Sequence, residues 1–174
     1  MPEFGIRTGT VGDAPLLSRI GAETFLATYG GKENPDQEDI LRYISIAYDE
    51  EVIRKELIDE GFRYLIAESG NEPAGYARLK IGSYTKDLAA KRPLEISRIY
   101  LLPQFQGSGL GKKLMERCFE EAERFSCDAI WLSVWRQNEK AIGFYERMGF
   151  KIAGTVFFDL AGTLHEDLMM AREV

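Results

Sequence analysis

Three alternating glycines stand in a short run that could bind an anion. The run reads Gln104-Phe105-Gln106-Gly107-Ser108-Gly109-Leu110-Gly111-Lys112, and a helical pattern follows it directly. Glycines allow positive φ and let the backbone come close to a ligand. The first turn of a helix adds unpaired N–H groups and a positive dipole end, which suit pyrophosphate. A tight strand–helix turn that binds no ligand is the alternative interpretation.

The spacing of this run excludes two common phosphate loops. A Walker A loop needs Ser or Thr after Gly-Lys, and here Lys113 follows Gly111-Lys112. A dinucleotide fingerprint needs G-x-G-x-x-G, whereas these glycines are spaced G-x-G-x-G. The run therefore indicates a different class of phosphate ligand.

Two segments together resemble the GNAT N-acetyltransferase superfamily. Gln104-x-x-Gly107-x-Gly109 is similar to its Q/R-x-x-G-x-G/A pyrophosphate loop. The segment from Asn138 to Phe150 resembles its N-x-x-A-x-x-F-Y-x-x-x-G-F pattern, and the two stand in the superfamily's order. A narrower similarity is to bacterial Pai-type polyamine acetyltransferases, carried by Thr24-Phe25, Thr28-Tyr29, Leu132-Ser133-Val134-Trp135, Phe157-Phe158-Asp159-Leu160 and Glu166-Asp167-Leu168-Met169-Met170. The stretch from Ala161 to His165 does not match that group.

The resemblance implies acetyl transfer from acetyl-CoA to an amine by direct attack, with both substrates bound together. The resemblance places two groups of residues against the cofactor. The pyrophosphate would be held by Gln106, Gly107, Ser108, Gly109, Leu110, Gly111 and Lys112, and the pantetheine by Ile99, Tyr100 and Leu101. A backbone N–H of the second group would also donate to the thioester oxygen. Asn138 would hydrogen-bond the pantetheine arm, or serve as a helix N-cap, or both. Tyr145 would protonate the leaving thiolate, with a core aromatic as the alternative.

A protonated amine must lose a proton before it attacks, because its pKa lies near 10. Glu95 matches a glutamate that part of the superfamily uses as a base, and its alternative is a surface ion pair with Arg98 or Arg78. A single histidine, His165, falls in a turn-like stretch, where we expect it to be solvated.

Acidic residues concentrate in one segment that could attract a cation. Between Glu23 and Glu60 there are eleven acidic and four basic residues, an excess of seven negative charges. Solvated helix faces are the alternative. With the resemblance, the segment predicts a spermidine- or spermine-like acceptor held by Tyr29, Glu33, Asp36 and Asp39. The rivals are an acetyltransferase for a protein amine or an aminoglycoside, and a CoA-binding regulator with little catalysis.

Periodicity and turn residues predict the elements that must position these groups. The expected order is β-α-α-α-β-β-β-α-β-α-β-β, an α/β (α+β) GNAT fold with one mixed, mostly antiparallel twisted sheet flanked by helices. Expected strands are 4–8, 62–68, 74–81, 94–102, 129–134, 152–160 and 164–171. Expected helices run from the Asp13 cap to about Tyr29, from Asn34-Pro35-Asp36, from Asp49-Glu50-Glu51 to Gly61, and over 110–125 and 139–148.

Length and composition limit the number of domains and the kinds of partner that this protein could have. The 174 residues, 45% of them hydrophobic, suit a single N-acetyltransferase domain over 1–174. A net charge of −6 argues against nucleic-acid binding, and no run of about 20 apolar residues or secretory signal is present, so we expect a cytoplasmic protein without membrane contact. One histidine and two cysteines, Cys118 and Cys127, predict no metal site and two reduced thiols. A homodimer is compatible with this sequence.

Overall fold

The computed structural model describes residues 3–31 and 36–174, and its centre is one seven-stranded sheet. The strands lie in the order β1-β2-β3-β4-β5-β7-β6, and every neighbouring pair is antiparallel except β4–β5. The strands are β1 (Phe4–Thr8), β2 (Phe62–Ser69), β3 (Glu72–Ile81), β4 (Pro93–Leu101), β5 (Ala129–Val134), β6 (Lys151–Leu160) and β7 (Thr163–Glu173). The expected order of elements and the single mixed, mostly antiparallel sheet flanked by helices are both confirmed.

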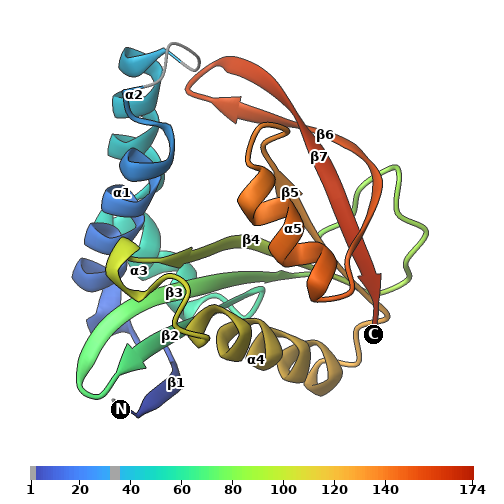
Figure 1. The fold of residues 1–174 in the computed structure, drawn as a ribbon, viewed down its shortest axis with the longest axis horizontal. Helices are drawn as coiled ribbons and strands as arrows, with labels where there is room; N and C mark the ends of the chain where they lie inside the picture. Colours follow the sequence, from blue (N-terminus) through green and yellow to red (C-terminus); the bar gives the residue numbers. More distant parts are fainter. Residues whose placement is uncertain (1–2, 32–35) are drawn as a thin grey trace.

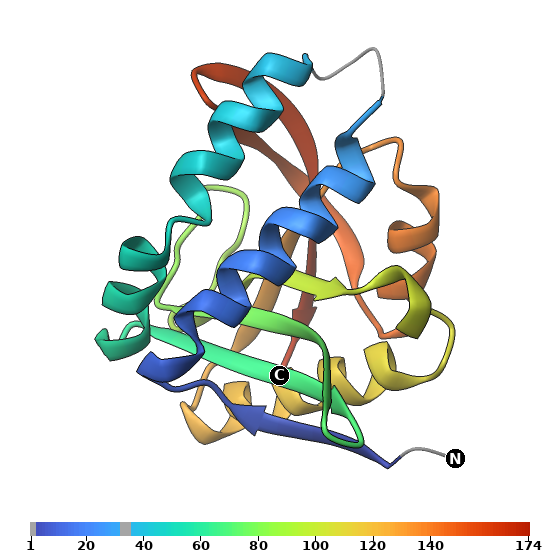
Figure 2. The ribbon, with the colours of Figure 1, turned by 90° about the vertical axis from the view of Figure 1, so that its left-hand side faces the viewer.

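Helices cover both faces of the sheet. They are α1 (Ala14–Tyr29), α2 (Gln37–Ala47), α3 (Glu50–Ile58), α4 (Leu110–Arg124) and α5 (Glu139–Arg147), with short 3-10 turns at Val11–Asp13 and Pro103–Phe105. Figure 2 shows α1, α2 and α3 in front of the strands, whereas α4 lies against the other face (Figures 1 and 2). Apolar side chains fill both interfaces, with Leu114 and Cys118 of α4 on one side and Leu17 and Ile20 of α1 on the other. None of the helices in the described residues is long and apolar enough to cross a bilayer.

Aspartates stand at the start of the first three helices, and only the first of them, Asp13, was predicted as an N-cap. Asp36 and Asp49 accept hydrogen bonds from the first backbone N–H groups of α2 and α3, as N-caps do. Asp13 occupies the N-cap position of α1, but its carboxylate instead pairs with Arg7 and accepts from the N–H of Thr10. These interactions, chiefly the bond from Arg7, lower the pKa of Asp13 to about 2. Asp13 therefore ties β1 to the start of α1.

A buried arginine fixes the middle of β4 to the helical layer. Arg98 is 6% exposed, and its guanidinium carbon lies 4.5 Å from the centroid of the Tyr48 ring. Its Nη2 donates a 3.0 Å hydrogen bond to the carbonyl of Ala47, the last residue of α2. A helix C-terminus attracts a cation, so α2 compensates part of this buried charge. A second contact links the same two parts of the structure: the hydroxyls of Tyr48, just after α2, and Tyr100 of β4 lie 2.8 Å apart and form a hydrogen bond.

Some boundaries differ from expectation. Helix α3 ends at Ile58 rather than continuing to Gly61, because Asp59 leaves the helical conformation (ψ 124°) and accepts from the N–H of Gly61. The final turn is also shorter than expected. Ala161 and Gly162 both adopt positive φ and complete the turn, so β7 starts at Thr163, one residue before the expected start, and His165 lies within the strand rather than in the turn. The expectation that His165 lies in a solvated turn is therefore wrong.

Gly75 lets β3 come close to the end of β4. A Cβ there would lie 2.1 Å from the carbonyl oxygen of Tyr100, and backbone cannot rotate away from such a contact. We expect Gly75→Ala to lower the free energy of unfolding by about 1–3 kcal/mol, the usual range for overpacking. Gly5→Ala in β1 meets nothing within 4 Å and serves as the matched control. Equal urea midpoints for the two variants would contradict this account.

Candidate active site

Among the described strands, β4 and β5 are the only parallel neighbours, and the sheet opens between them. Strands β4 and β5 pair at Pro93↔Ala129, Leu94↔Ile130 and Glu95↔Trp131, and beyond these positions they diverge (Figure 1). The divergence follows a bulge in β4, where the pairing with β3 shifts between Ile96 and Arg98. A cleft of about 740 Å³ occupies the opening, within the range of small-molecule sites. It is lined from both strands by Ile96–Leu101 and Leu132–Trp135.

The glycine run forms one end of this cleft. Gly107 and Gly109 have φ of 77° and 92°, and a Cβ at either position would meet nothing within 4 Å. Helix α4 starts immediately after them, and the N–H of Leu110 bonds to the hydroxyl of Ser108. Several further N–H groups donate to no acceptor in the described part of the chain, namely those of Gly107, Ser108, Gly109, Gly111 and Lys112. The loop is therefore an open cradle of donors at a helix N-terminus, which fits a phosphate group.

Helix α5 supplies the amide and the phenol beside the opening. Asn138 is its N-cap, and its Oδ1 accepts a 3.2 Å hydrogen bond from the N–H of Ala141. The side-chain NH₂ of the same residue is left to face the cleft. Tyr145 is 9% exposed, packs against Phe144 and Phe150, and also lines the cleft. Burial raises the pKa of Tyr145 above its ordinary value, so its hydroxyl stays protonated at neutral pH.

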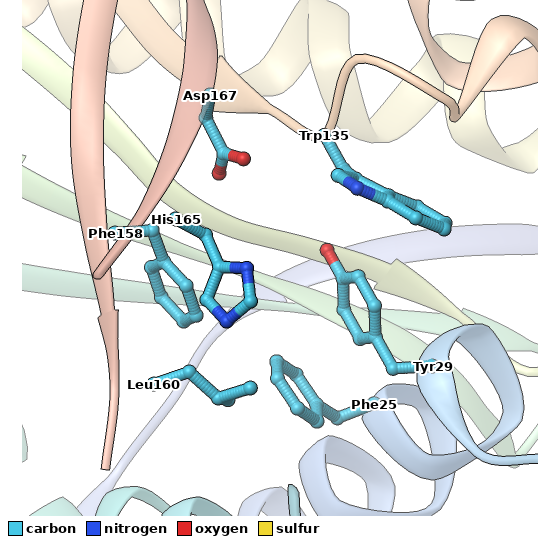
Figure 3. A pocket seen from close by; sticks show the side chains of 7 residues that line it. All are labelled: Phe25, Tyr29, Trp135, Phe158, Leu160, His165 and Asp167. Carbon is cyan, nitrogen blue, oxygen red and sulfur yellow. The ribbon is translucent and has the colours of Figure 1, made fainter. Parts of the chain in front are cut away.

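An aromatic pocket continues the cleft on the side away from the glycine loop. Its space is about 20 Å³, enough for one water-sized group. Figure 3 shows Tyr29 and Trp135 on one side and Phe158 with the His165 ring on the other, with Asp167 at one end. The full lining is Phe25, Tyr29, Trp135, Phe158, Leu160, His165 and Asp167. We call these seven residues the aromatic pocket.

Asp167 lies where the aromatic pocket meets the cleft, since it lines both. It is 7% exposed, and its carboxylate accepts no hydrogen bond from the described residues. Burial raises its pKa to about 6, while His165 and Arg136 act in the opposite direction. His165 contributes a second unsatisfied group, because its buried Nε2 has no hydrogen-bond partner among the described residues. Both polar groups are therefore available to a ligand.

The cleft brings together most of the predicted site residues. Those that line it are Ile99, Tyr100, Leu101, Gln106, Gly107, Gly109, Gly111, Lys112, Asn138, Tyr145 and Tyr29. Ser108 and Leu110 do not, because the Ser108 hydroxyl turns back to the carbonyl of Phe105 and Leu110 is fully buried. Gln106 bonds to the carbonyl of Leu101 and accepts from Lys140, so it braces the loop.

Three further predicted residues, Glu95, Asp36 and Asp39, lie elsewhere. Glu95 is absent from the described lining of the cleft, and its carboxylate accepts a 2.6 Å hydrogen bond from Ser83. The alternative ion pairs do not form either, since Arg78 pairs with Glu56. Asp36 caps α2, while Asp39 accepts from Thr163 and lies 3.7 Å from Arg42. Glu33 lies outside the described residues.

The residues that sequence reasoning missed are Asp167 and His165. They stand two apart on β7, and such a spacing places two side chains on the same face of a strand. Their signal was a pair of polar residues on the strand face that also carries the apolar Met169 and Ala171. The expected strand over 164–171 contains His165, but the turn-like stretch around this residue indicated a solvated role, and the pair was therefore not recognised.

Residues 24–150 match the model of the acetyltransferase (GNAT) family. The chain belongs to the GNAT family. It is 31% identical over 160 residues to an uncharacterized N-acetyltransferase of Lactobacillus delbrueckii subsp. lactis, covering 92% of this chain and 91% of that protein. This GNAT chain is accordingly an N-acetyltransferase, and thus an acyltransferase enzyme.

Two further similarities concern named GNAT proteins. The fold superposes on the PaiA N-acetyltransferase from Thermoplasma acidophilum, crystallised with coenzyme A, with a TM-score of 0.78 at 23% identity over 99% of both chains. A shorter match, 35% identical over 65 residues, joins 37% of this chain to 43% of the spermine/spermidine N(1)-acetyltransferase of Bacillus subtilis. Among the described residues, no three His, Cys, Asp or Glu side chains are grouped so as to hold a metal.

The raised pKa of Asp167 makes stability depend on pH. The folded protein binds a proton there with a pKa of about 6, against an ordinary value of 3.8, so it holds that proton more tightly than the unfolded chain. The contribution of this group to stability therefore falls as pH rises from about 4 to about 6. Asparagine is neutral throughout. We expect Asp167→Asn to have a higher Tm than the wild type at about pH 7.5, and the difference to shrink towards about pH 4.5. A pH-independent difference in thermal melts would contradict the assignment.

Proposed function

We propose that this N-acetyltransferase transfers the acetyl group of acetyl-CoA to a primary amine of a small polycation, such as spermidine or spermine, in a ternary complex. One observation carries the proposal. A single continuous cleft joins the donor cradle of the glycine loop to Tyr145 and then to the aromatic pocket with its buried carboxylate. The partial similarity to a spermine/spermidine acetyltransferase supports the acceptor class.

The described residues fit acetyl-CoA as a co-substrate. The N–H groups of Gly107, Ser108, Gly109, Gly111 and Lys112 would hold the pyrophosphate, and Lys112 also lines this end of the cleft. Beyond Glu95, the β5-facing backbone groups of β4 have no strand partner. Ile99, Tyr100 and Leu101 would therefore pair with the pantetheine amides as a neighbouring strand would. The side-chain NH₂ of Asn138 would bond the same arm from the opposite wall.

The chemistry follows from position. The neutral amine attacks the carbonyl carbon of the thioester, a C–N bond forms, and the C–S bond breaks. A β4 N–H stabilises the charge that develops on the carbonyl oxygen. Tyr145 donates its proton to the departing sulfur, the amine nitrogen releases a proton to solvent, and the tyrosinate takes up a proton from solvent, so that the phenol is restored. The protein supplies orientation and hydrogen bonds, and no acyl-enzyme is needed.

The cysteines agree with direct transfer. Cys118 and Cys127 are free and buried, and burial raises the pKa of both thiols. Neither contributes to the described lining of the cleft. A thiol that stays protonated in the core is a poor nucleophile. A covalent acetyl-cysteine step therefore has no suitable residue in this cleft.

The same proposal includes the number of domains, the class of partner, the cellular location and the oligomeric state. We take residues 1–174 as one N-acetyltransferase domain, because the sheet that builds the cleft draws strands from both halves of the chain. The net charge of −6 favours a cationic small molecule over a nucleic acid or an anionic membrane surface. A cytoplasmic location and a homodimer stay predictions, which fractionation and sedimentation equilibrium would test.

Gly109→Glu tests the glycine cradle. The new carboxylate would project into the open space where the pyrophosphate is expected and would repel it. We expect the variant to fold and to lose acetyl-CoA binding in a calorimetric titration. Gly162→Glu is the matched control, since Gly162 has a similar φ of 98° and equally open surroundings in the β6–β7 turn. Unchanged affinity in a folded Gly109→Glu protein would remove the loop from the site.

Tyr145→Phe tests the leaving-group role. The substitution keeps the packing against Phe144 and Phe150 and deletes only the hydroxyl. Loss of a general acid typically lowers the rate by about 10²–10⁴-fold, and we expect kcat to fall within that range while acetyl-CoA affinity changes little. A kcat within about threefold of the wild type would make Tyr145 a packing residue.

The polycation claim is tested by ionic strength. Spermidine should have a higher kcat/KM than a monoamine of similar length at low salt, because it keeps charges that are not consumed in the reaction. The advantage should shrink in about 0.5 M salt, where the screening length falls to a few ångströms. Equal kcat/KM values at low salt would shift the assignment towards a protein amine or another monocationic acceptor.

A further inference from the structure

The aromatic pocket has the features of a binding site for one charged group. Its polar edge carries a 7% exposed carboxylate, Asp167, that accepts no hydrogen bond from the described residues. The unsatisfied Nε2 of His165 also faces the pocket, on the side of the ring turned toward Leu160 and away from Asp167 (Figure 3). Leaving such groups unpaired costs free energy, which a donor in the pocket would recover. An anion is excluded by the carboxylate, and a neutral group would leave the charge of Asp167 uncompensated.

The walls favour a cation in particular. The rings of Phe25 and Tyr29 lie 4.6 Å apart, those of Tyr29 and Trp135 5.6 Å, and those of Phe25 and Phe158 6.5 Å, measured between centroids. Electron-rich ring faces arranged around a small space stabilise an ammonium group. The space of about 20 Å³ admits one water-sized group, which matches a terminal –NH₃⁺ and is too small for a guanidinium.

The position of the pocket decides which amine it would hold. Tyr145 and the glycine loop line the cleft but not the aromatic pocket, whereas Asp167 lines both. The amine that reacts must be neutral, and a buried carboxylate beside it would favour its charged form. The pocket therefore suits the ammonium that is not acetylated.

We propose that the aromatic pocket, with Asp167 at its edge, anchors the distal ammonium of a diamine or polyamine acceptor and so positions the other amine for transfer. This inference rests on the proposed function and assigns to β7 the role that the sequence had given to Glu33, Asp36 and Asp39. In this arrangement the ammonium donates to the Asp167 carboxylate. Its methylene stem then extends into the cleft, which Asp167 also lines.

The test compares diamines with monoamines of equal carbon number, from three to five carbons. In the wild type we expect each diamine to exceed its monoamine in kcat/KM by at least about tenfold, with one preferred length. Asp167→Asn should reduce this ratio to about one by raising KM for the diamine, with kcat changed less than about threefold. Glu166→Gln is the matched control, because it removes the same charge one residue away, where Glu166 pairs with Arg136 on the exposed face. Its diamine preference should persist.

A binding measurement separates this inference from the proposed function. Butylamine and 1,4-diaminobutane are titrated calorimetrically into the CoA-bound wild type, Asp167→Asn and Glu166→Gln proteins. Loss of diamine binding only in Asp167→Asn supports the anchor, even if the wild type acetylates no polyamine and the proposed acceptor class fails. A wild type that prefers diamines while Asp167→Asn retains the same preference and affinity overturns the anchor and leaves the proposed function standing. No binding of either probe by the wild type also overturns the anchor.

Discussion

The site depends on one constraint in the sheet, which is that the parallel pairing of β4 with β5 stops after Glu95 and Trp131. Backbone N–H and C=O groups that lose a strand partner need another partner when they are buried. The opening therefore creates both the space for an extended ligand and the hydrogen-bonding groups that would hold it. The cradle at Gly107–Gly109, the α5 residues and the aromatic pocket are all arranged around this opening.

The opening is kept by packing on the helical face of β4. Arg98 follows the bulge directly and is held by the C-terminal carbonyl of α2 and the ring of Tyr48, while Tyr100 bonds Tyr48 through its hydroxyl. On the other side, Gly75 allows β3 to lie close to the end of the same strand. The helices α1–α3 thus do more than cover the sheet, because they fix the edge of β4 that faces the cleft. The same α1 also carries Phe25 and Tyr29 into the aromatic pocket.

Local chemistry explains which features could be predicted from the sequence. The glycine run, the Asn138 cap and the aspartate caps of α2 and α3 follow from short-range backbone requirements, so their positions agree closely. The splay of β4 from β5 could not be predicted, because it arises from pairing between distant segments. For Asp36 and Asp39, the sequence predicted a binding role that the structure does not support. Their charges suggested substrate binding, yet their oxygens are engaged by a helix N-terminus and by Thr163. Asp167 is a buried carboxylate and is more informative than the acidic segment, since burial gives a carboxylate a much stronger local electrostatic effect.

The central claim is that acetyl-CoA and the amine occupy one cleft together, with no covalent enzyme intermediate. Initial rates measured over a matrix of acetyl-CoA and spermidine concentrations test it most directly. A shared cleft predicts double-reciprocal lines that intersect, because both substrates must be bound before any product leaves. Parallel lines, with acetyl groups found on the protein when acetyl-CoA is supplied alone, would contradict it.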